Sequence, residues 1–179
     1  MRLILSNDDG VHAPGLATLH EVLLERGDCL VVAPSGPRSG VGHAVTERQP
    51  MGLEEHAPGR FGLDGTPADC ARVALGRGAA FAREQLGDAA RGPALWLVSG
   101  INHGANLGVD TYISGTAAAA REAAILGHPS IAISQYVRKH REPDWRATAR
   151  RARRVLEVLL EQPPRAGHFW NVNLPHPAD

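Results

Sequence analysis

The chain has 179 residues, of which 43% are hydrophobic, and its 19 lysines and arginines balance its 19 aspartates and glutamates. A formal charge of zero leaves no broad basic surface to attract a nucleic acid duplex or an anionic membrane, so we expect neither as a partner. The composition suits one sizeable core, and we predict a single domain over residues 1–179. Two distant cysteines, no basic leader and no apolar stretch long enough for a membrane span predict a reduced, cytoplasmic protein.

The first half of the chain alternates between strand-like and helix-like patterns. Residues 2–6 form a short apolar run that predicts a strand, and Pro14 opens a helix whose apolar residues recur at helical spacing until Gly27. Residues 29–33 are apolar on both faces, as a central parallel strand is. Residues 36–65 alternate only weakly among glycines and prolines, and we interpret them as an excursion or a β-hairpin.

The same alternation continues to the end of the chain. Thr66 is a good N-cap, and the proline after it suits the first position of a helix. The later predicted elements are a strand at 94–99, an alanine-rich helix from Ser114, a strand at 130–134, a long amphipathic helix at 145–159 and a strand at 168–174. The polar, glycine-rich stretch after residue 99 is too long for a simple turn and predicts a functional loop. The whole pattern predicts an α/β fold: a doubly wound, mostly parallel sheet with helices on both faces.

Three polar clusters follow three of the predicted strands. They lie at residues 7–10, 37–40 and 100–102, each just after the carboxyl end of a strand. Doubly wound folds place their ligands at these ends, so we expect the clusters to converge on one place. The first cluster holds two adjacent carboxylates, Asp8 and Asp9, with no basic residue beside them. Such like charges resist ionising together unless a positive charge lies between them.

The side chains of these clusters predict a site for one hard divalent cation. Asp8 and Asp9 offer carboxylates. Ser39 offers a hydroxyl and Asn102 an amide carbonyl, and all of these are oxygen donors of the kind that Mg²⁺, Mn²⁺ and Ca²⁺ prefer. No set of cysteines and histidines with zinc spacing competes with them. A cation here would supply the missing charge and leave positions open for water and for a substrate oxygen, and its natural substrate is a phosphate.

The alanine-rich helix predicts where that phosphate lies. Its start at Ser114, Gly115 and Thr116 offers unpaired backbone N–H groups and two hydroxyls, and the glycine allows an anion to approach closely. Simpler interpretations stay open at this point: the two hydroxyls as helix caps, the paired aspartates as a solvated turn, and Ser39 and Asn102 as ordinary loop residues. Convergence of the three clusters favours the metal site.

Four segments resemble one known family. NDDG after the first strand, the RSG of APSGPRSG, GTPADC and above all SGINHGANLGVDTYISGTAAAA are similar to the SurE survival-protein family of metal-dependent nucleotidases. The likeness runs from residue 1 to residue 175. It implies a Rossmann-like domain that removes phosphate from nucleoside 5′- or 3′-monophosphates with broad base tolerance. It also implies that the enzyme, a 5′-nucleotidase, sometimes trims short polyphosphate.

The resemblance also implies the residues of the site. Carried over by position, the family's metal ligands are Asp8, Asp9, Ser39 and Asn102. The residues of its phosphate pocket are Asn106, Ser114, Gly115 and Thr116. The metal is then one Mg²⁺ or Mn²⁺ per subunit, and Ca²⁺ is an alternative occupant.

The chain departs from the family pattern in two ways. His103, Ser35 and Val109 replace residues that are usual in the family, which bears on pocket shape and substrate preference. Family members usually continue past NVNLP with a segment that exchanges between subunits, whereas this sequence ends at Asp179. We therefore expect a single domain without the swapped segment, and the family implies a homodimer or a homotetramer.

The expected reaction is metal-assisted hydrolysis. A bound cation polarises the phosphoryl oxygen and lowers the pKa of a bound water, while Asp8 or Asp9, as the catalytic residue, orients that water or accepts its proton. Two other classes stay open: a phosphatase that forms an aspartyl-phosphate, and a nucleotide-binding module without turnover. The first usually separates its two acids by one residue. The second expects G-x-G-x-x-G after the first strand, which GVHAPG does not supply.

Overall fold

The computed structural model describes residues 1–87 and 94–176, and within them seven strands form one sheet. The strands are β1 (Arg2–Ser6), β2 (Asp28–Pro34), β3 (Leu53–Ala57), β4 (Arg60–Leu63), β5 (Leu95–His103), β6 (Ser130–Gln135) and β7 (Trp170–Leu174). Their spatial order is β3-β4-β2-β1-β5-β6-β7, and every neighbouring pair is parallel except the β3–β4 hairpin. The predicted mostly parallel α/β sheet is therefore confirmed, and so is a hairpin within residues 36–65.

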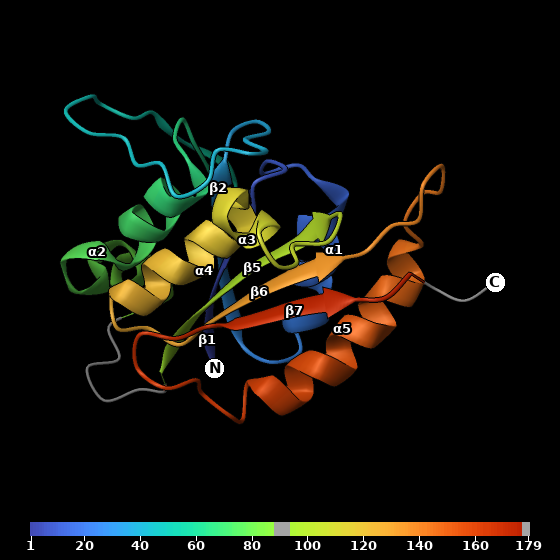
Figure 1. Ribbon diagram of the computed structural model, residues 1–179. Coiled ribbons are helices and arrows are strands. Elements are labelled where there is room, and N and C mark those ends of the chain that lie inside the picture. Colours follow the sequence, from blue (N-terminus) through green and yellow to red (C-terminus); the bar gives the residue numbers. More distant parts are fainter. Residues whose placement is uncertain (88–93, 177–179) are drawn as a thin grey trace.

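Helices cover both faces of the sheet (Figure 1). They are α1 (Pro14–Leu23), α2 (Pro67–Leu86), α3 (Asp110–Ile113), α4 (Gly115–Ile125) and α5 (Trp145–Leu159). Side chains alternate along β1: Leu3 and Leu5 pack in the core beneath α1 and α5, and Ile4 packs in the core beneath α2 and α4. This two-sided burial explains why the central strands are apolar throughout. No helix in the described part of the chain is long and apolar enough to cross a membrane.

Strand β5 is longer than predicted. The sequence predicts a strand that ends at residue 99 and a loop after it. Instead β5 continues to His103, and Asn102 is its next-to-last residue. The reason is Gly100, whose φ is +141° and where a Cβ atom would lie only 2.2 Å from the Ile133 carbonyl oxygen on the neighbouring strand. A glycine lets β5 and β6 approach here, although their register shifts between Ser99 and Asn102.

The order in which the chain adds strands to the sheet reverses next to β1. From β1 it passes to β2 and the β3–β4 hairpin on one side, and it then returns to β5, β6 and β7 on the other. The carboxyl ends of β1 and β5 therefore flank a topological switch point, where a crevice opens in this class of fold. The first and third polar clusters predicted from the sequence both lie at this point.

Asp69 joins the start of α2 to the long loop after β2. Its Oδ2 accepts hydrogen bonds from the Thr66 backbone N–H at 2.9 Å and from the Thr46 hydroxyl at 2.7 Å, and its Oδ1 accepts one from the Thr46 N–H at 2.9 Å. Thr66 is the N-cap of α2, as predicted, and it forms a capping box with Asp69. Burial alone would raise the pKa of Asp69, but these hydrogen bonds outweigh it and hold the pKa below its ordinary value.

We expect Asp69→Asn to lower the free energy of unfolding at pH 7 by about 2 kcal/mol, since it removes the charged hydrogen bonds from Thr46 together with the Asp69 half of the capping box. Because the folded pKa is depressed, the stabilisation by Asp69 is complete above the ordinary aspartate pKa of about 3.9 and disappears as the pH falls through the lower folded value. Urea unfolding at pH 7 and at pH 3 measures this. A difference between wild type and variant that does not shrink at pH 3 would contradict the assignment.

Candidate metal and phosphate site

A closed turn after β1 carries the two adjacent carboxylates. The Asn7 side chain donates to the Gly10 carbonyl at 2.9 Å and accepts from the Gly10 N–H at 3.2 Å, and Gly10 has a φ of +104° that suits glycine. Within this turn Asp8 is buried, with 5% of its surface exposed, while Asp9 is half-buried. The two acids therefore lie in different surroundings although they are neighbours in the chain.

Asp8 is a buried carboxylate that receives one hydrogen bond from a distant helix. The Thr116 hydroxyl, at the start of α4, donates to Asp8 Oδ1 at 2.5 Å. Burial raises the pKa of Asp8, the charge of Asp9 raises it further, and the bond from Thr116 offsets only part of this. Among the described residues neither Asp8 nor Asp9 has a cationic side chain as an ion-pair partner. The pair thus lacks the positive charge that a bound cation would supply.

The loop after β2 is bound to this turn through its backbone. The Arg38 N–H donates to the Asp8 carbonyl at 2.7 Å, and the Gly42 N–H donates to the Ile113 carbonyl at 3.0 Å. Ser39 lies between these two attachments, in a turn, with its side chain exposed. The structure therefore brings the Ser39 segment next to Asp8, as the sequence predicts.

The end of β5 contacts the second carboxylate. The His103 N–H donates to Asp9 Oδ2 at 3.2 Å, which joins the carboxyl ends of β1 and β5. The Asn102 Nδ2 donates to the Gly104 carbonyl at 2.7 Å. This bond uses the amide nitrogen, and no residue that the structure describes donates a hydrogen bond to the Asn102 Oδ1, which leaves that oxygen in the form that a metal ligand takes.

The start of α4 lies against Asp8. A Cβ atom on Gly115 would lie 2.7 Å from Asp8 Cβ and 2.9 Å from Pro67 Cγ, so only glycine allows this approach. Ser114 is the N-cap of α4, and its hydroxyl accepts from the Ala117 N–H at 3.0 Å. Ser114 therefore caps the helix, a role that is compatible with the predicted phosphate binding, whereas the Thr116 hydroxyl contacts Asp8.

Residues of β6 and β7 hold Asn106 in position. Its Nδ2 donates to the Ser134 hydroxyl at 2.8 Å, and its N–H donates to Asn173 Oδ1 at 2.8 Å. Its carbonyl accepts from the side-chain amides of Asn171 at 3.0 Å and Asn173 at 3.2 Å. Neither of these two supporting asparagines was predicted; the polar positions of NVNL in an expected strand were the sequence signal that could have identified them.

A buried glutamate holds the Ser39 loop against two helices. Glu122 of α4, 3% exposed, has His43 Nε2 at 2.7 Å from its Oε2 and accepts from Arg72 Nε of α2 at 2.7 Å on its Oε1. His43 belongs to the same loop as Ser39, and the loop is therefore fixed to α4 beyond its backbone attachments. This role was not predicted, although a charged residue inside an alanine-rich helix was a sequence signal for it.

The donor set of this site favours a hard cation. In residues 1–87 and 94–176 no three or more histidine, cysteine, aspartate or glutamate side chains gather as a metal-binding group. The candidate set instead combines two carboxylates with one hydroxyl and one amide oxygen, a chemistry that suits Mg²⁺ or Mn²⁺ rather than zinc. The cysteines, Cys29 and Cys70, are both free.

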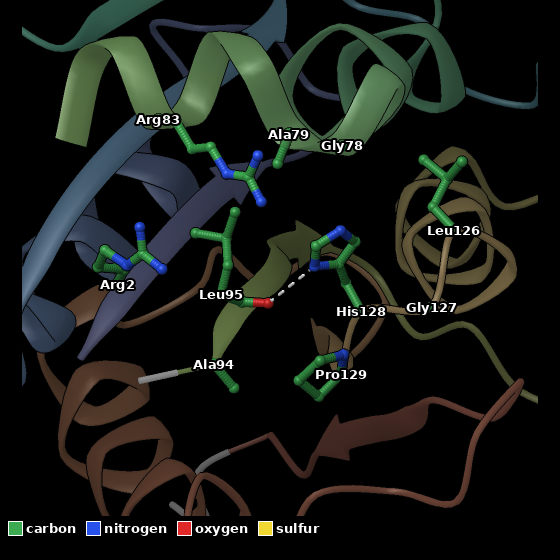
Figure 2. A pocket seen from close by; sticks show the side chains of 10 residues that line it. All are labelled: Arg2, Gly78, Ala79, Arg83, Ala94, Leu95, Leu126, Gly127, His128 and Pro129. Atoms are coloured by element: carbon green, nitrogen blue, oxygen red, sulfur yellow. Dashed lines mark hydrogen bonds between the residues drawn. The ribbon is translucent and has the colours of Figure 1, made fainter. Parts of the chain in front are cut away.

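Two cavities lie at opposite ends of the central strands. One, of about 460 Å³, is drawn in Figure 2 and is lined by Arg2, Arg83 and Leu95 together with His128, whose Nδ1 lies 3.3 Å from the Leu95 carbonyl oxygen. It lies at the amino ends of β1 and β5, away from the paired carboxylates. The other, of about 290 Å³, is a cleft bordered by Asp9 at the carboxyl ends. Because ligands of doubly wound folds bind at carboxyl ends, the cleft is the one relevant to the site.

The fold and this arrangement define a doubly wound α/β protein with a carboxylate pair at its topological switch point. The profile of the family described as "Survival protein SurE" matches residues 3–179. The chain belongs to the SurE family, which confirms the resemblance found in the sequence.

Individual relatives agree with this. A protein from Synechocystis sp. is 45% identical over 176 residues, which are 98% of this chain and 72% of that protein. A relative named 5′-nucleotidase SurE, from Syntrophobacter fumaroxidans, is 39% identical over 100% of this chain and 68% of its own length. The crystal structure of the SurE protein from Aquifex aeolicus superimposes with a TM-score of 0.85 at 34% identity, covering 99% of this chain and 67% of that one.

Proposed function

We propose that this protein is a divalent-metal-dependent phosphatase that hydrolyses nucleoside 5′-monophosphates, and also 3′-monophosphates, to nucleoside and phosphate. The observation that carries the proposal is the buried Asp8 beside Asp9 at the switch point, without a cationic partner among the described residues and with the start of α4 pressed against it. Relatives named 5′-nucleotidase support the substrate class.

The proposed ligands of the cation are Asp8, Asp9, Ser39 and Asn102, with one Mg²⁺ or Mn²⁺ per subunit. When bound, the metal supplies a Lewis acid for the phosphoryl oxygen and a water of lowered pKa. The backbone N–H groups at the start of α4 bind the phosphate oxygens, Gly115 lets that start lie against Asp8, and Asn106 borders the same pocket. The hydroxyl of Thr116 serves Asp8 rather than the phosphate, since it already donates to that carboxylate.

The two carboxylates take different roles in this proposal. Asp8 is buried and its Oδ1 accepts from Thr116, so it contributes fixed negative charge to the cation site. Asp9 is half-buried and borders the cleft, and the His103 N–H engages only its Oδ2. Asp9 is therefore the carboxylate placed to orient the attacking water and to accept its proton.

A panel of substrates tests this function. Phosphate release is measured from 5′- and 3′-nucleoside monophosphates and from short polyphosphate with Mn²⁺ or Mg²⁺ present, and we expect turnover of the 5′-monophosphates. Acid quenching during turnover of labelled substrate separates the proposed direct hydrolysis from an aspartyl-phosphate route, because only the latter leaves label on the protein. Binding of nucleotides without phosphate release would contradict the proposal.

Thr116→Val is expected to weaken the site without unfolding the protein. Valine keeps the volume but cannot donate to Asp8, and losing a hydrogen bond that supports a metal ligand costs about 10- to 100-fold in metal affinity or activity. Titration with Mn²⁺ and the rate of phosphate release measure this. Thr18→Val is the matched control, since Thr18 donates within α1 to the Pro14 carbonyl at 2.8 Å. Equal effects of the two substitutions would contradict the role of Thr116.

We further propose that residues 1–179 form one domain and that subunits associate as a homodimer or homotetramer. The single domain is inferred from the size of the core and the assembly from the family, and light scattering of the purified protein measures the assembly.

A further inference from the structure

The cleft beside Asp9 is built from three elements that meet at the switch point. It lies between the start of α1, the end of β5 and the start of α5, and its volume is about 290 Å³. Its lining includes Asp9 from the turn after β1 and His103 from the end of β5, together with Trp145 at the start of α5 and Glu142 just before it. The cleft thus contains both a proposed metal ligand and an aromatic side chain.

Close packing fixes the position of that ring. A Cβ atom on Gly15 would lie 1.9 Å from the Ile101 carbonyl oxygen and 3.1 Å from Trp145 Cη2, so α1 presses directly on β5 and on the indole. Trp145 is only partly buried and packs against the core beneath α1 and α5. Contacts with α1 and the core therefore fix the orientation of the indole, while part of its surface remains accessible.

Charge decides which part of a substrate the cleft accepts. Its border carries the carboxylates of Asp9 and Glu142. Glu142 lies outside the proposed cation site and repels a phosphate, whose proposed position is at the start of α4. An uncharged group with hydroxyls and a flat ring suits the cleft instead, because carboxylates accept hydrogen bonds from hydroxyls and an aromatic face stacks on a ring.

We propose that this cleft binds the nucleoside part of the substrate, with the base against Trp145 and the ribose hydroxyls toward Glu142. The inference rests on the proposed nucleotidase function and assigns the residues that recognise the leaving group. The volume lies close to the lower end of the range for pockets that hold small organic ligands, which suits one nucleoside. Stacking is tolerant of base identity because every base has a π-face, so the cleft favours nucleotides without selecting strongly among them.

The test compares AMP with ribose 5-phosphate, which has the same phosphate and sugar but no base. For Trp145→Ala we expect the ratio of kcat/KM for AMP to kcat/KM for ribose 5-phosphate to fall about 10-fold, a typical loss for one base–aromatic stack. Trp170→Ala is the matched control, since Trp170 is a partly exposed tryptophan on β7 whose Nε1 donates to the Gln162 carbonyl. An unchanged ratio in folded Trp145→Ala, or an equal fall in the control, overturns the proposal.

Adenosine separates failure of this inference from failure of the proposed function. Calorimetry of adenosine binding requires neither metal nor turnover, and we expect binding to wild type and to Trp170→Ala and about 10-fold weaker binding to Trp145→Ala. If wild type hydrolyses neither phosphate ester, the function fails and adenosine binding alone decides the cleft. If Trp145→Ala does not fold, Trp145→Leu retains apolar packing against Gly15, lacks the aromatic face, and gives the same comparison. Adenosine binding that is absent from wild type, or equal in all variants, overturns the inference.

Discussion

Asp8→Asn is expected to lower the rate of phosphate release about 10³-fold while leaving the protein folded. The reason is electrostatic: the substitution removes one of two carboxylates at the proposed cation site, and metal-assisted charge stabilisation contributes several kcal/mol to such reactions, where each 1.4 kcal/mol is tenfold. Asparagine preserves the shape, and its carbonyl oxygen can still accept from Thr116. Steady-state kinetics with saturating Mn²⁺, together with circular dichroism, measures both parts of the prediction.

The same substitution that lowers activity is not expected to lower the free energy of unfolding of the metal-free protein. Burial and the charge of Asp9 raise the pKa of Asp8, so the contribution of this group to stability is complete below the ordinary aspartate pKa of about 3.9 and is lost as the pH rises through the raised folded value. Without metal, Asp8→Asn should therefore be at least as stable as wild type at pH 7. Asp28→Asn, an exposed aspartate at the far end of the sheet, is the control and should change neither quantity. Turnover by Asp8→Asn at the wild-type rate would contradict the site.

Removal of divalent metal is expected to abolish activity by a similar factor, ~10³-fold or more. Chelation leaves Asp8 and Asp9 as uncompensated neighbours, because the described part of the chain offers them no cationic partner. Activity should return on addition of Mn²⁺ or Mg²⁺. The measurement is phosphate release from AMP before EDTA treatment, after it and after metal is restored.

Thermal unfolding provides a second readout that does not depend on turnover. Mn²⁺ at about 100 times its dissociation constant stabilises a native protein by about 2.7 kcal/mol, so it should raise the melting temperature of wild type and have little effect on Asp8→Asn. A calcium titration tests whether Ca²⁺ occupies the same place. Equal turnover with and without chelator, or equal stabilisation of wild type and Asp8→Asn, would remove the metal from the proposal.

The helices and strands show which features of the fold are local. The apolar runs of β1, β2 and β6, the proline and Thr66 that start α1 and α2, and the stripe of α5 are all encoded in neighbouring residues, and each predicted element is present. The predicted end of β5 was wrong. The close approach of Gly100 to Ile133 is a contact between two strands, and the polar residues that follow resemble a loop when each is considered alone. The hairpin within residues 36–65 was predicted, but its strands were not located, because little alternation marks them.

The candidate site divides in the same way. Residue types alone show that two adjacent carboxylates follow a buried strand and that oxygen donors lie near the carboxyl ends of two others, because residue type is a local property. Only tertiary contacts give the carboxylates different environments: Asp8 is buried and bonded to Thr116, 108 residues away, while Asp9 borders a cleft. Tertiary contacts also bring Glu122 to the loop of His43, Asn171 and Asn173 to Asn106, and Trp145 to the cleft that Asp9 borders. These contacts join segments far apart in the chain, and no local pattern records which distant partner a side chain meets.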